Sequence, residues 1–249
     1  MKKTTSVLLL LFKTSLFFSQ TTQLINESGF KHNYVVGPLQ FIEDAKDTAR
    51  LKYIATLKVS DKQSNLQSPA AWFDLIKGKA KESGANSYLV SEFLEDDNSM
   101  SVILKFYFAG QKFLEQNKQR AKFDSVILFN QTRHLKDTAS FYLNDKQILF
   151  DPLTYFVFET KPYVPYYVAT SVSNVTAKKI LIKKVQKARF FIIPSNKSSF
   201  VLNRSSLEPN SVGIGIGGII VTFGRNAAYE LGYDVGRFLF ALYSLNKVE

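Results

Sequence analysis

Cysteine is absent from the 249-residue sequence. Without thiols the chain can form no disulfide framework, no cysteine-ligated zinc site and no thiol nucleophile. It also lacks the cysteine that bacterial lipoproteins use for lipid attachment, so no lipid anchor is expected. Proteins without cysteine are common in the bacterial periplasm, where oxidation pairs stray thiols.

Histidine is almost as scarce, with only His32 and His134. Neither lies beside a second histidine, or a carboxylate at a metal-binding helical spacing, so no metal site is predicted. A Ser-His-Asp triad is assembled by geometry and is compatible with any spacing, but no G-x-S-x-G motif supports one. The sequence therefore predicts no catalytic residue, no metal and no cofactor.

Long apolar runs are also missing. Residues 1–19 begin with Lys2 and Lys3 and continue with apolar residues that Lys13 interrupts. A membrane-spanning helix needs about 20 apolar residues, so this segment is predicted to be a secretory signal peptide rather than a span. A buried N-terminal helix is the alternative. We expect an exported chain, in the periplasm or at the periplasmic face of the outer membrane, with no transmembrane span in its mature form.

Negative charge is in the minority, and the formal net charge is +11. Basic residues concentrate between positions 178 and 189, and the candidate ligands are Lys178, Lys179, Lys183, Lys184, Lys187 and Arg189. On an edge strand such residues deter aggregation, and they could also bind an anionic envelope component such as a sugar or lipid phosphate. Solvated lysines without a ligand are the simpler interpretation. Export argues against nucleic acid as a partner.

Residues 50–110 contain the clearest pattern of the chain. Alternating apolar residues from Leu51 to Val59 predict a strand. Ser68 and Pro69 are typical of a helix start, and Gly84 is typical of the residue after a helix, where φ is positive. The apolar face of that helix consists of Trp72, Phe73, Ile76 and Ala80. Two further strands, ending near Phe108, complete a predicted βαββ module.

The segment from Phe73 to Val90, in which Ser83-Gly84-Ala85-Asn86 leads from helix to strand, resembles small bacterial envelope modules of the Rcs-type envelope stress sensor kind. That family is lipid-anchored and disulfide-bonded, so its anchoring and signalling do not carry over to a chain without cysteine. Residues 141–146 and 155–162 are similar to β-rich domains of unknown function in exported bacterial proteins. Neither resemblance implies catalytic residues.

The remaining segments complete an α+β prediction. Residues 20–49 are expected to be an extended lead-in with a short strand near 33–36, and residues 111–123 a linker or a short bridging helix. Seven short strands within 124–211 predict an antiparallel β-sandwich-like domain, or a larger sheet shared with the first module. The predicted strands are 126–129, 141–143, 148–150, 155–158, 166–170, 179–184 and 189–193.

The C-terminal segment, 212–249, is predicted to be a glycine-rich strand followed by a helix over 227–245. Gly213, Gly215 and Gly218 match G-x-G-x-x-G, but the run continues as a strand rather than as the helix of a dinucleotide site. Gly232 and Gly236 would let the helix approach a neighbouring surface closely. We expect Phe238, Leu239 and Leu242 to pack on the body of the protein.

These features favour a non-enzymatic, exported, envelope-associated binding or assembly module, with an anionic envelope component or an envelope protein as partner. The first alternative is a periplasmic hydrolase that uses carboxylates such as Asp124, Asp137 or Asp151. The second is a structural partner of an outer-membrane assembly, docked through the C-terminal segment. The acidic group from Glu92 to Asp97 lacks the residue order of a calcium loop and is interpreted as a solvated turn.

Overall fold

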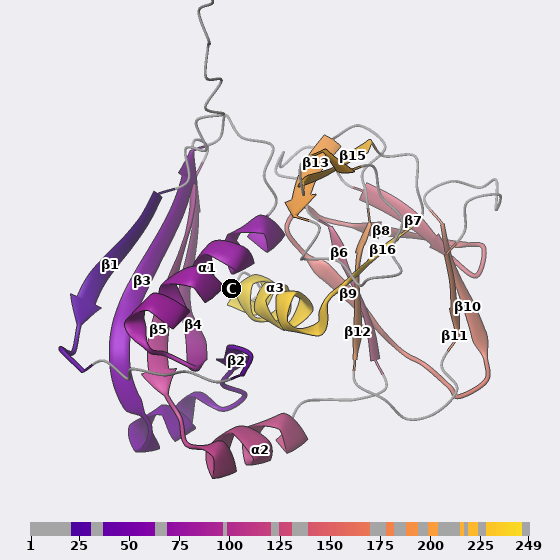
Figure 1. Cartoon of the computed structure of the whole chain (residues 1–249). Coiled ribbons are helices and arrows are strands. Elements are labelled where there is room, and N and C mark those ends of the chain that lie inside the picture. The colour runs from indigo at the N-terminus through magenta and orange to yellow at the C-terminus, as the bar shows by residue number, and fades with distance from the viewer. Residues whose placement is uncertain are drawn as a thin grey trace, which may run out of the picture.

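The chain folds as a mixed α+β protein, as predicted, with four sheets among the described residues. The computed structural model describes residues 21–30, 37–62, 69–96, 99–120, 125–130, 139–169, 178–181, 188–193, 199–203, 215–216, 219–223 and 228–245. In Figure 1 the N-terminal sheet lies on one side, the later strands lie on the other, and the C-terminal helix α3 lies between them. The predicted signal peptide falls outside the described residues.

The N-terminal sheet has five strands in the order β1-β3-β5-β4-β2. Its elements are β1 (Thr21–Glu27), β2 (Gln40–Phe41), η1 (Ala45–Arg50), β3 (Lys52–Lys62), α1 (Pro69–Ser83), β4 (Ser87–Asp96) and β5 (Ser99–Phe108). The alternation that predicted the first strand is explained by burial, since Leu57 and Val59 of β3 are fully buried. Gly84 follows α1 with φ of 80°, as predicted. The cap residue Ser68 lies outside the described residues.

The lead-in is more structured than expected. It supplies β1, which pairs with β3, the two-residue β2, which pairs in parallel with β4, and the short helix η1. The three strands of the predicted βαββ module therefore belong to a five-stranded sheet rather than to a sheet of their own. Lead-in residues 33–36 lie outside the described part of the chain. Residues 111–123 were predicted to be a linker or a short helix, and the helix is confirmed as α2 (Gln111–Arg120).

A strand is present at each of the seven positions predicted after residue 124, and the predicted residues 170 and 182–184 lie outside the described part of the chain. They are β6 (Ser125–Asn130), β7 (Ala139–Leu143), β8 (Lys146–Phe150), β9 (Tyr155–Glu159), β10 (Pro165–Ala169), β11 (Lys178–Leu181) and β12 (Arg189–Ile193). Asn144 and Asp145 join β7 to β8 with φ of 48° and 66°, the pattern of a type I′ hairpin turn.

These strands form two four-stranded sheets, ordered β16-β12-β6-β9 and β11-β10-β7-β8, where β16 is Tyr229–Leu231. The prediction of purely antiparallel pairing is wrong, because β6 and β12 pair in parallel. A hydrophobic cluster joins the two sheets, with Leu128 and Phe191 from one and Phe141 and Val168 from the other. A third small sheet has the order β13-β15-β14, formed by β13 (Ser199–Asn203), β14 (Gly215–Ile216) and β15 (Ile219–Phe223).

The prediction of a single glycine-rich strand is wrong, because the described residues of this run form two antiparallel strands, β14 and β15. Gly215 belongs to β14, which pairs antiparallel with β15. Gly213 and Gly218 lie outside the described residues. The predicted helix over 227–245 begins later, since α3 spans Tyr233–Leu245 and residues 229–231 form β16 on β12.

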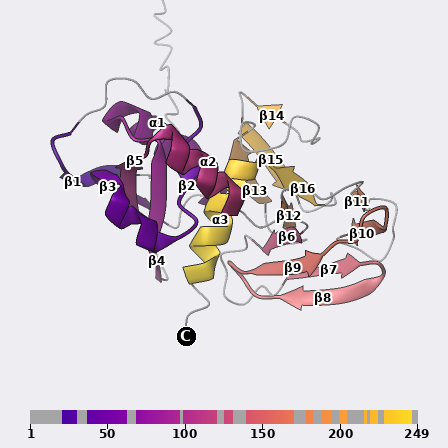
Figure 2. The same ribbon diagram turned by 90° about the horizontal axis from the view of Figure 1, so that it is seen from below.

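Helix α3 is the central element of the fold. It contacts α1, β2 and β4 of the N-terminal part and β12 of the other part. Phe238, Leu239 and Leu242 are fully buried, as predicted, in a core that also contains Phe73 of α1 and Phe190 of β12. Figure 2 shows α3 crossing between the two parts when the molecule is seen from below. One hydrophobic core therefore spans both parts of the chain.

Gly236 sets how closely α3 approaches β12. A Cβ atom at this position would lie 2.1 Å from Cγ of Phe190, which is buried. We expect Gly236→Ala to lower the free energy of unfolding by about 1–3 kcal/mol, because the ring must move within a packed core. Urea unfolding followed by circular dichroism would measure this change.

Gly78 of α1 provides the control for that substitution. It is exposed, and a Cβ there would meet no atom within 4 Å. Gly78→Ala should stabilise the protein by roughly 0.5–1 kcal/mol through helix propensity alone. Equal stabilisation by both substitutions would contradict the proposed close contact between Gly236 and Phe190.

Candidate functional site

The predicted basic site is divided between two sheets. Lys178 and Lys179 lie in β11, which is an edge strand as expected, whereas Arg189 begins β12 in the other four-stranded sheet. Arg189 makes a bidentate pair with Glu230 of β16, with its Nε and Nη2 atoms 2.6 and 2.7 Å from the two carboxylate oxygens. Its charge is therefore already matched within the fold. Lys183, Lys184 and Lys187 lie outside the described residues, so an anionic ligand at the lysines stays a prediction.

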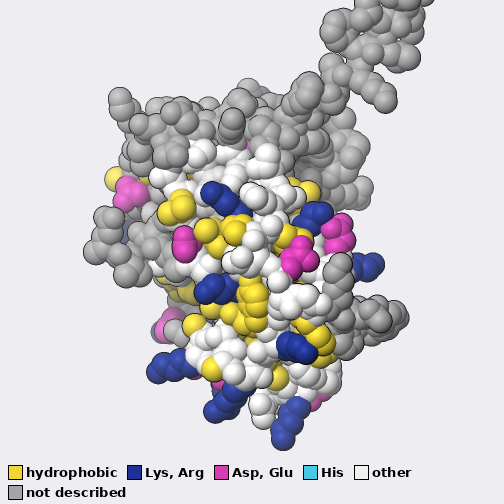
Figure 3. Space-filling view, turned by 90° about the vertical axis from the view of Figure 1, so that its left-hand side faces the viewer, with side chains coloured by type: hydrophobic (Ala, Val, Ile, Leu, Met, Phe, Trp, Pro, Cys, Tyr) yellow, Lys and Arg dark blue, Asp and Glu magenta, His cyan; other side chains and the backbone are white. Residues whose placement is uncertain are grey.

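The excess positive charge is not confined to residues 178–189. Figure 3 shows basic, acidic and apolar side chains intermixed on the side of the molecule that carries the N-terminal sheet, with basic ones more numerous toward its lower end. The net charge of the chain is thus spread over more than one surface.

The carboxylates and histidines considered for catalysis fall mostly outside the described residues. These are Asp124, Asp137, His32 and His134. Asp151 is described, and its main-chain oxygen accepts hydrogen bonds from Asn130 Nδ2 at 2.8 Å and Thr154 Oγ1 at 2.6 Å. Within the described part of the chain, no group of three or more histidines and carboxylates is placed to hold a metal ion. None of the described helices is long and apolar enough to cross a membrane.

A pocket of about 260 Å³ lies where α3 meets β2, β4 and α2. We call it the seam pocket. Its lining residues are Pro38, Leu39, Gln40, Phe41, Glu43, Tyr88, Asn117, Lys118, Tyr233, Asp234 and Arg237. They come from four segments that are distant in sequence, so the pocket exists only in the complete fold.

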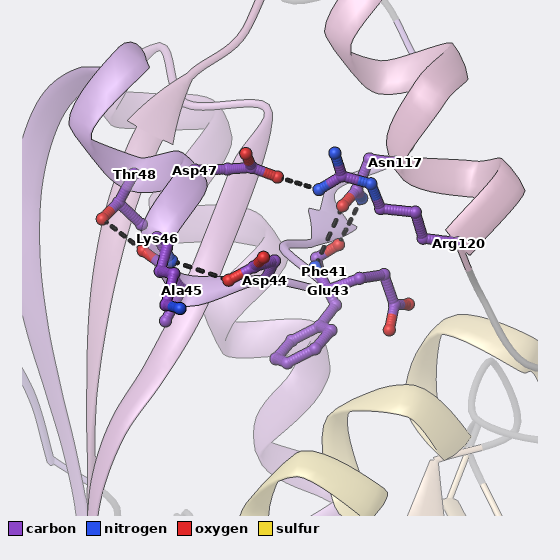
Figure 4. A network of polar contacts seen from close by, with 9 residues as sticks. All are labelled: Phe41, Glu43, Asp44, Ala45, Lys46, Asp47, Thr48, Asn117 and Arg120. Atoms are coloured by element: carbon purple, nitrogen blue, oxygen red, sulfur yellow. Dashed lines mark hydrogen bonds and ion pairs between the residues drawn. The ribbon is translucent and has the colours of Figure 1, made fainter.

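Helix α2 fixes the segment that forms one wall of the seam pocket. Asn117 donates from Nδ2 to the main-chain oxygen of Phe41 at 2.6 Å and accepts at Oδ1 from the Glu43 N–H at 2.9 Å. Arg120 pairs with Asp47 of η1, and Figure 4 shows both contacts between α2 and this segment. A strand of only two residues, such as β2, makes few hydrogen bonds to its neighbour in the sheet. The contacts of Asn117 and Arg120 therefore hold this segment in place in addition to the sheet.

A buried ion pair joins that wall to α3. Both oxygens of Glu43 accept from the guanidinium of Arg237, with Nε 3.1 Å from Oε1, and the two side chains are only 15% and 13% exposed. The guanidinium also lies over the rings of Phe41 and Phe240, at 4.8 and 5.3 Å from their centroids. Burial raises the pKa of Glu43 above its ordinary value, although Arg237 acts in the opposite direction.

Two polar atoms buried at the seam pocket have no hydrogen-bond partner within the described structure, namely Gln40 Oε1 and the Tyr88 hydroxyl. Tyr88 is 1% exposed and Gln40 9%. Burial raises the pKa of Tyr88 well above 10, and the nearby charge of Asp234 raises it further, so the phenol stays neutral. A buried polar group without a partner costs about 1–3 kcal/mol.

The charged groups of the seam pocket differ in exposure. Lys118 and Asp234 are exposed, whereas the side chains of Glu43 and Arg237 are largely buried and bound to each other. The formal charges of these four residues cancel. The pocket therefore combines balanced charges with a neutral floor of amide and phenol groups, whose polar atoms are buried beneath its surface.

A larger cavity of about 1090 Å³ shares Phe41, Glu43 and Arg237 with the seam pocket. It is bounded by residues 89–91 of β4, by β9, and by Phe240, Ala241 and Ser244 of α3. The Tyr155 ring of β9 packs on Phe240 with centroids 4.8 Å apart. The ion pair therefore contributes to the walls of both cavities.

Sequence reasoning missed the residues of the seam pocket. Gln40 lies in a segment without periodicity, and nothing in the sequence around Tyr88 distinguishes it from other apolar residues of a strand. The available signal was Arg237, a lone cation followed directly by the apolar run Phe238–Tyr243, which indicates a buried partner of opposite charge.

The described residues thus form a mixed α+β fold with a polar pocket at the seam that α3 bridges. Comparison of the chain with protein-family models, curated proteins and solved structures gives no match.

Proposed function

We propose that the protein is a non-enzymatic binding module of the bacterial cell envelope that holds a small ligand in the seam pocket. The observation that carries the proposal is the pair of buried atoms without partners, Gln40 Oε1 and the Tyr88 hydroxyl. Natural proteins rarely leave such groups unmatched. Both side chains line the pocket, but their polar atoms are buried, so a ligand would reach each atom only after that side chain turns toward the pocket. A ligand that then hydrogen-bonds both atoms would remove this cost.

The arrangement favours binding over hydrolysis. A hydrolase that uses carboxylates, the alternative considered above, needs a carboxylate that is free to transfer a proton. Both oxygens of Glu43 are occupied by Arg237, which suits an anchor of the pocket wall rather than a general acid or base. The envelope location rests on the predicted signal peptide and on the resemblance of residues 73–90 to envelope modules. We also infer that the two sheets around Leu128 and Phe141 form the predicted sandwich-like body that supports the site.

The first test compares ligand classes by thermal shift. Neutral sugars, amino acids, organic acids and nucleosides are each added to the wild-type protein and to Tyr88→Phe. We expect one class to raise the melting temperature of the wild type but not of the variant. If no class does so, the protein is not a binding module of this kind.

Tyr88→Phe should not harm the unliganded protein. Removal of a buried hydroxyl without a partner is neutral or stabilising, so the free energy of unfolding should be unchanged or rise by up to about 1 kcal/mol. Chemical denaturation without ligand measures it. A loss of more than about 1 kcal/mol would mean that the hydroxyl has a structural partner, and would remove the main support for the proposal.

A further inference from the structure

We infer that the ligand of the seam pocket is an uncharged polyhydroxylated molecule of about one ring, that is, a saccharide unit. This inference rests on the proposed function and adds the chemical class of the ligand. It follows from the groups at the floor of the pocket, from the state of its charges and from its size.

The groups without partners are those that pair with hydroxyls. Gln40 offers an amide and Tyr88 a neutral phenol, which can donate one hydrogen bond and accept another. A sugar hydroxyl also donates and accepts, so adjacent hydroxyls of one ring can satisfy both side chains. A carboxylate accepts only, and would leave the Gln40 oxygen without a donor.

The buried charged groups of the pocket are not available to an ionic ligand. Glu43 and Arg237 are bound to each other through both carboxylate oxygens. Lys118 and Asp234 are exposed, and water screens their charges. An ionic ligand that enters beyond Lys118 and Asp234 would separate the buried pair or leave its own charge unmatched, and either event costs desolvation energy. A neutral ligand avoids both costs.

The shape of the pocket agrees with a single ring. Its volume of about 260 Å³ is below the range of about 300–1,000 Å³ for sites that hold drug-sized molecules. The Phe41 and Tyr88 rings meet edge to face in its wall, with centroids 5.7 Å apart. The negative face of an aromatic ring attracts the positively polarised C–H groups of a sugar. Aromatic carbon beside amide and phenol groups therefore matches both surfaces of a saccharide.

The test is an NMR titration of the full chain with D-glucose, D-galactose and N-acetyl-D-glucosamine, with glycine as a zwitterion and inorganic phosphate as an anion. We expect saturable shifts with at least one sugar, and about tenfold weaker binding to Tyr88→Phe, as loss of one hydrogen bond implies. Tyr243→Phe is the matched control, because Tyr243 is fully buried but lines neither cavity. The affinity of this variant for the sugar should stay within about twofold of the wild-type value.

The outcomes separate this inference from the proposed function. Binding of glycine or phosphate that depends on Tyr88, without binding of any sugar, would overturn the saccharide inference and leave the binding module standing. Sugar binding that Tyr88→Phe leaves unchanged would overturn the assignment of sugars to the seam pocket. Absence of Tyr88-dependent binding in every class, as in the thermal-shift panel, would overturn the proposed function itself.

Discussion

A chain that ends at Gly232, and so lacks α3, should not fold cooperatively. The deletion removes Phe238, Leu239, Leu242 and Tyr243, which are all fully buried. Burial of each such side chain contributes about 1.5–3 kcal/mol. The four together contribute about 6–12 kcal/mol, which is comparable with the whole stability of a typical domain, about 5–15 kcal/mol.

Thermal denaturation followed by circular dichroism, together with size-exclusion chromatography, would measure the effect of this deletion. We expect an aggregating product without a cooperative transition, because the deletion exposes the apolar faces of α1, β4 and β12 that α3 contacts. Leu242→Ala is a graded companion variant and should cost about 2–5 kcal/mol. A truncated chain that stays monomeric and melts cooperatively would show that α3 docks on a body that is already stable.

Arg237→Met should destabilise the protein by about 3–5 kcal/mol, because it leaves the Glu43 carboxylate buried without its cation. The methionine keeps much of the packing against Phe41 and Phe240, so the loss reports mainly on charge. Chemical denaturation at neutral pH measures it. The double variant Glu43→Met, Arg237→Met should recover most of the loss, since an apolar pair of similar volume is often as stable as a buried ion pair.

The cost of Arg237→Met should also depend on pH. Burial already raises the pKa of Glu43, and removal of Arg237 takes away the charge that lowers it. The folded variant then binds a proton more tightly than its unfolded chain does. Its stability relative to the wild type therefore rises as the pH falls through the raised pKa. A difference in unfolding free energy that stays constant between pH 4 and 7 would contradict this account.

The fold was predictable wherever periodicity is local. Alternation in β3 and in the seven strands after residue 124 located these elements, and Pro69 and Gly84 located the ends of α1. The sequence did not predict β2, because a two-residue strand is defined by its parallel partner β4 and not by its own pattern. The start of α3 was placed too early because Ala227 and Ala228 favour a helix, whereas pairing with β12 makes residues 229–231 a strand.

The candidate site was less predictable than the fold. Gln40, Tyr88 and Arg237 are single polar positions in different elements, and only the packing of α3 brings them to one pocket. The basic stretch was the most visible sequence feature, yet Arg189 is used in an ion pair across β12 and β16. A local cluster of charged residues thus predicted an exposed basic surface. The position of the buried polar atoms could not be predicted in this way, because it depends on contacts between residues distant in sequence.

The position of α3 also determines the order in which the protein can complete its structure. The contact between Glu43 and Arg237 joins residues 194 positions apart. A ribosome that synthesises the chain from its N-terminus has made both β-rich parts before the helix that packs between them. Contacts of such high sequence separation slow folding. We therefore expect the nascent chain to stay incompletely packed, and accessible to chaperones, until α3 has emerged.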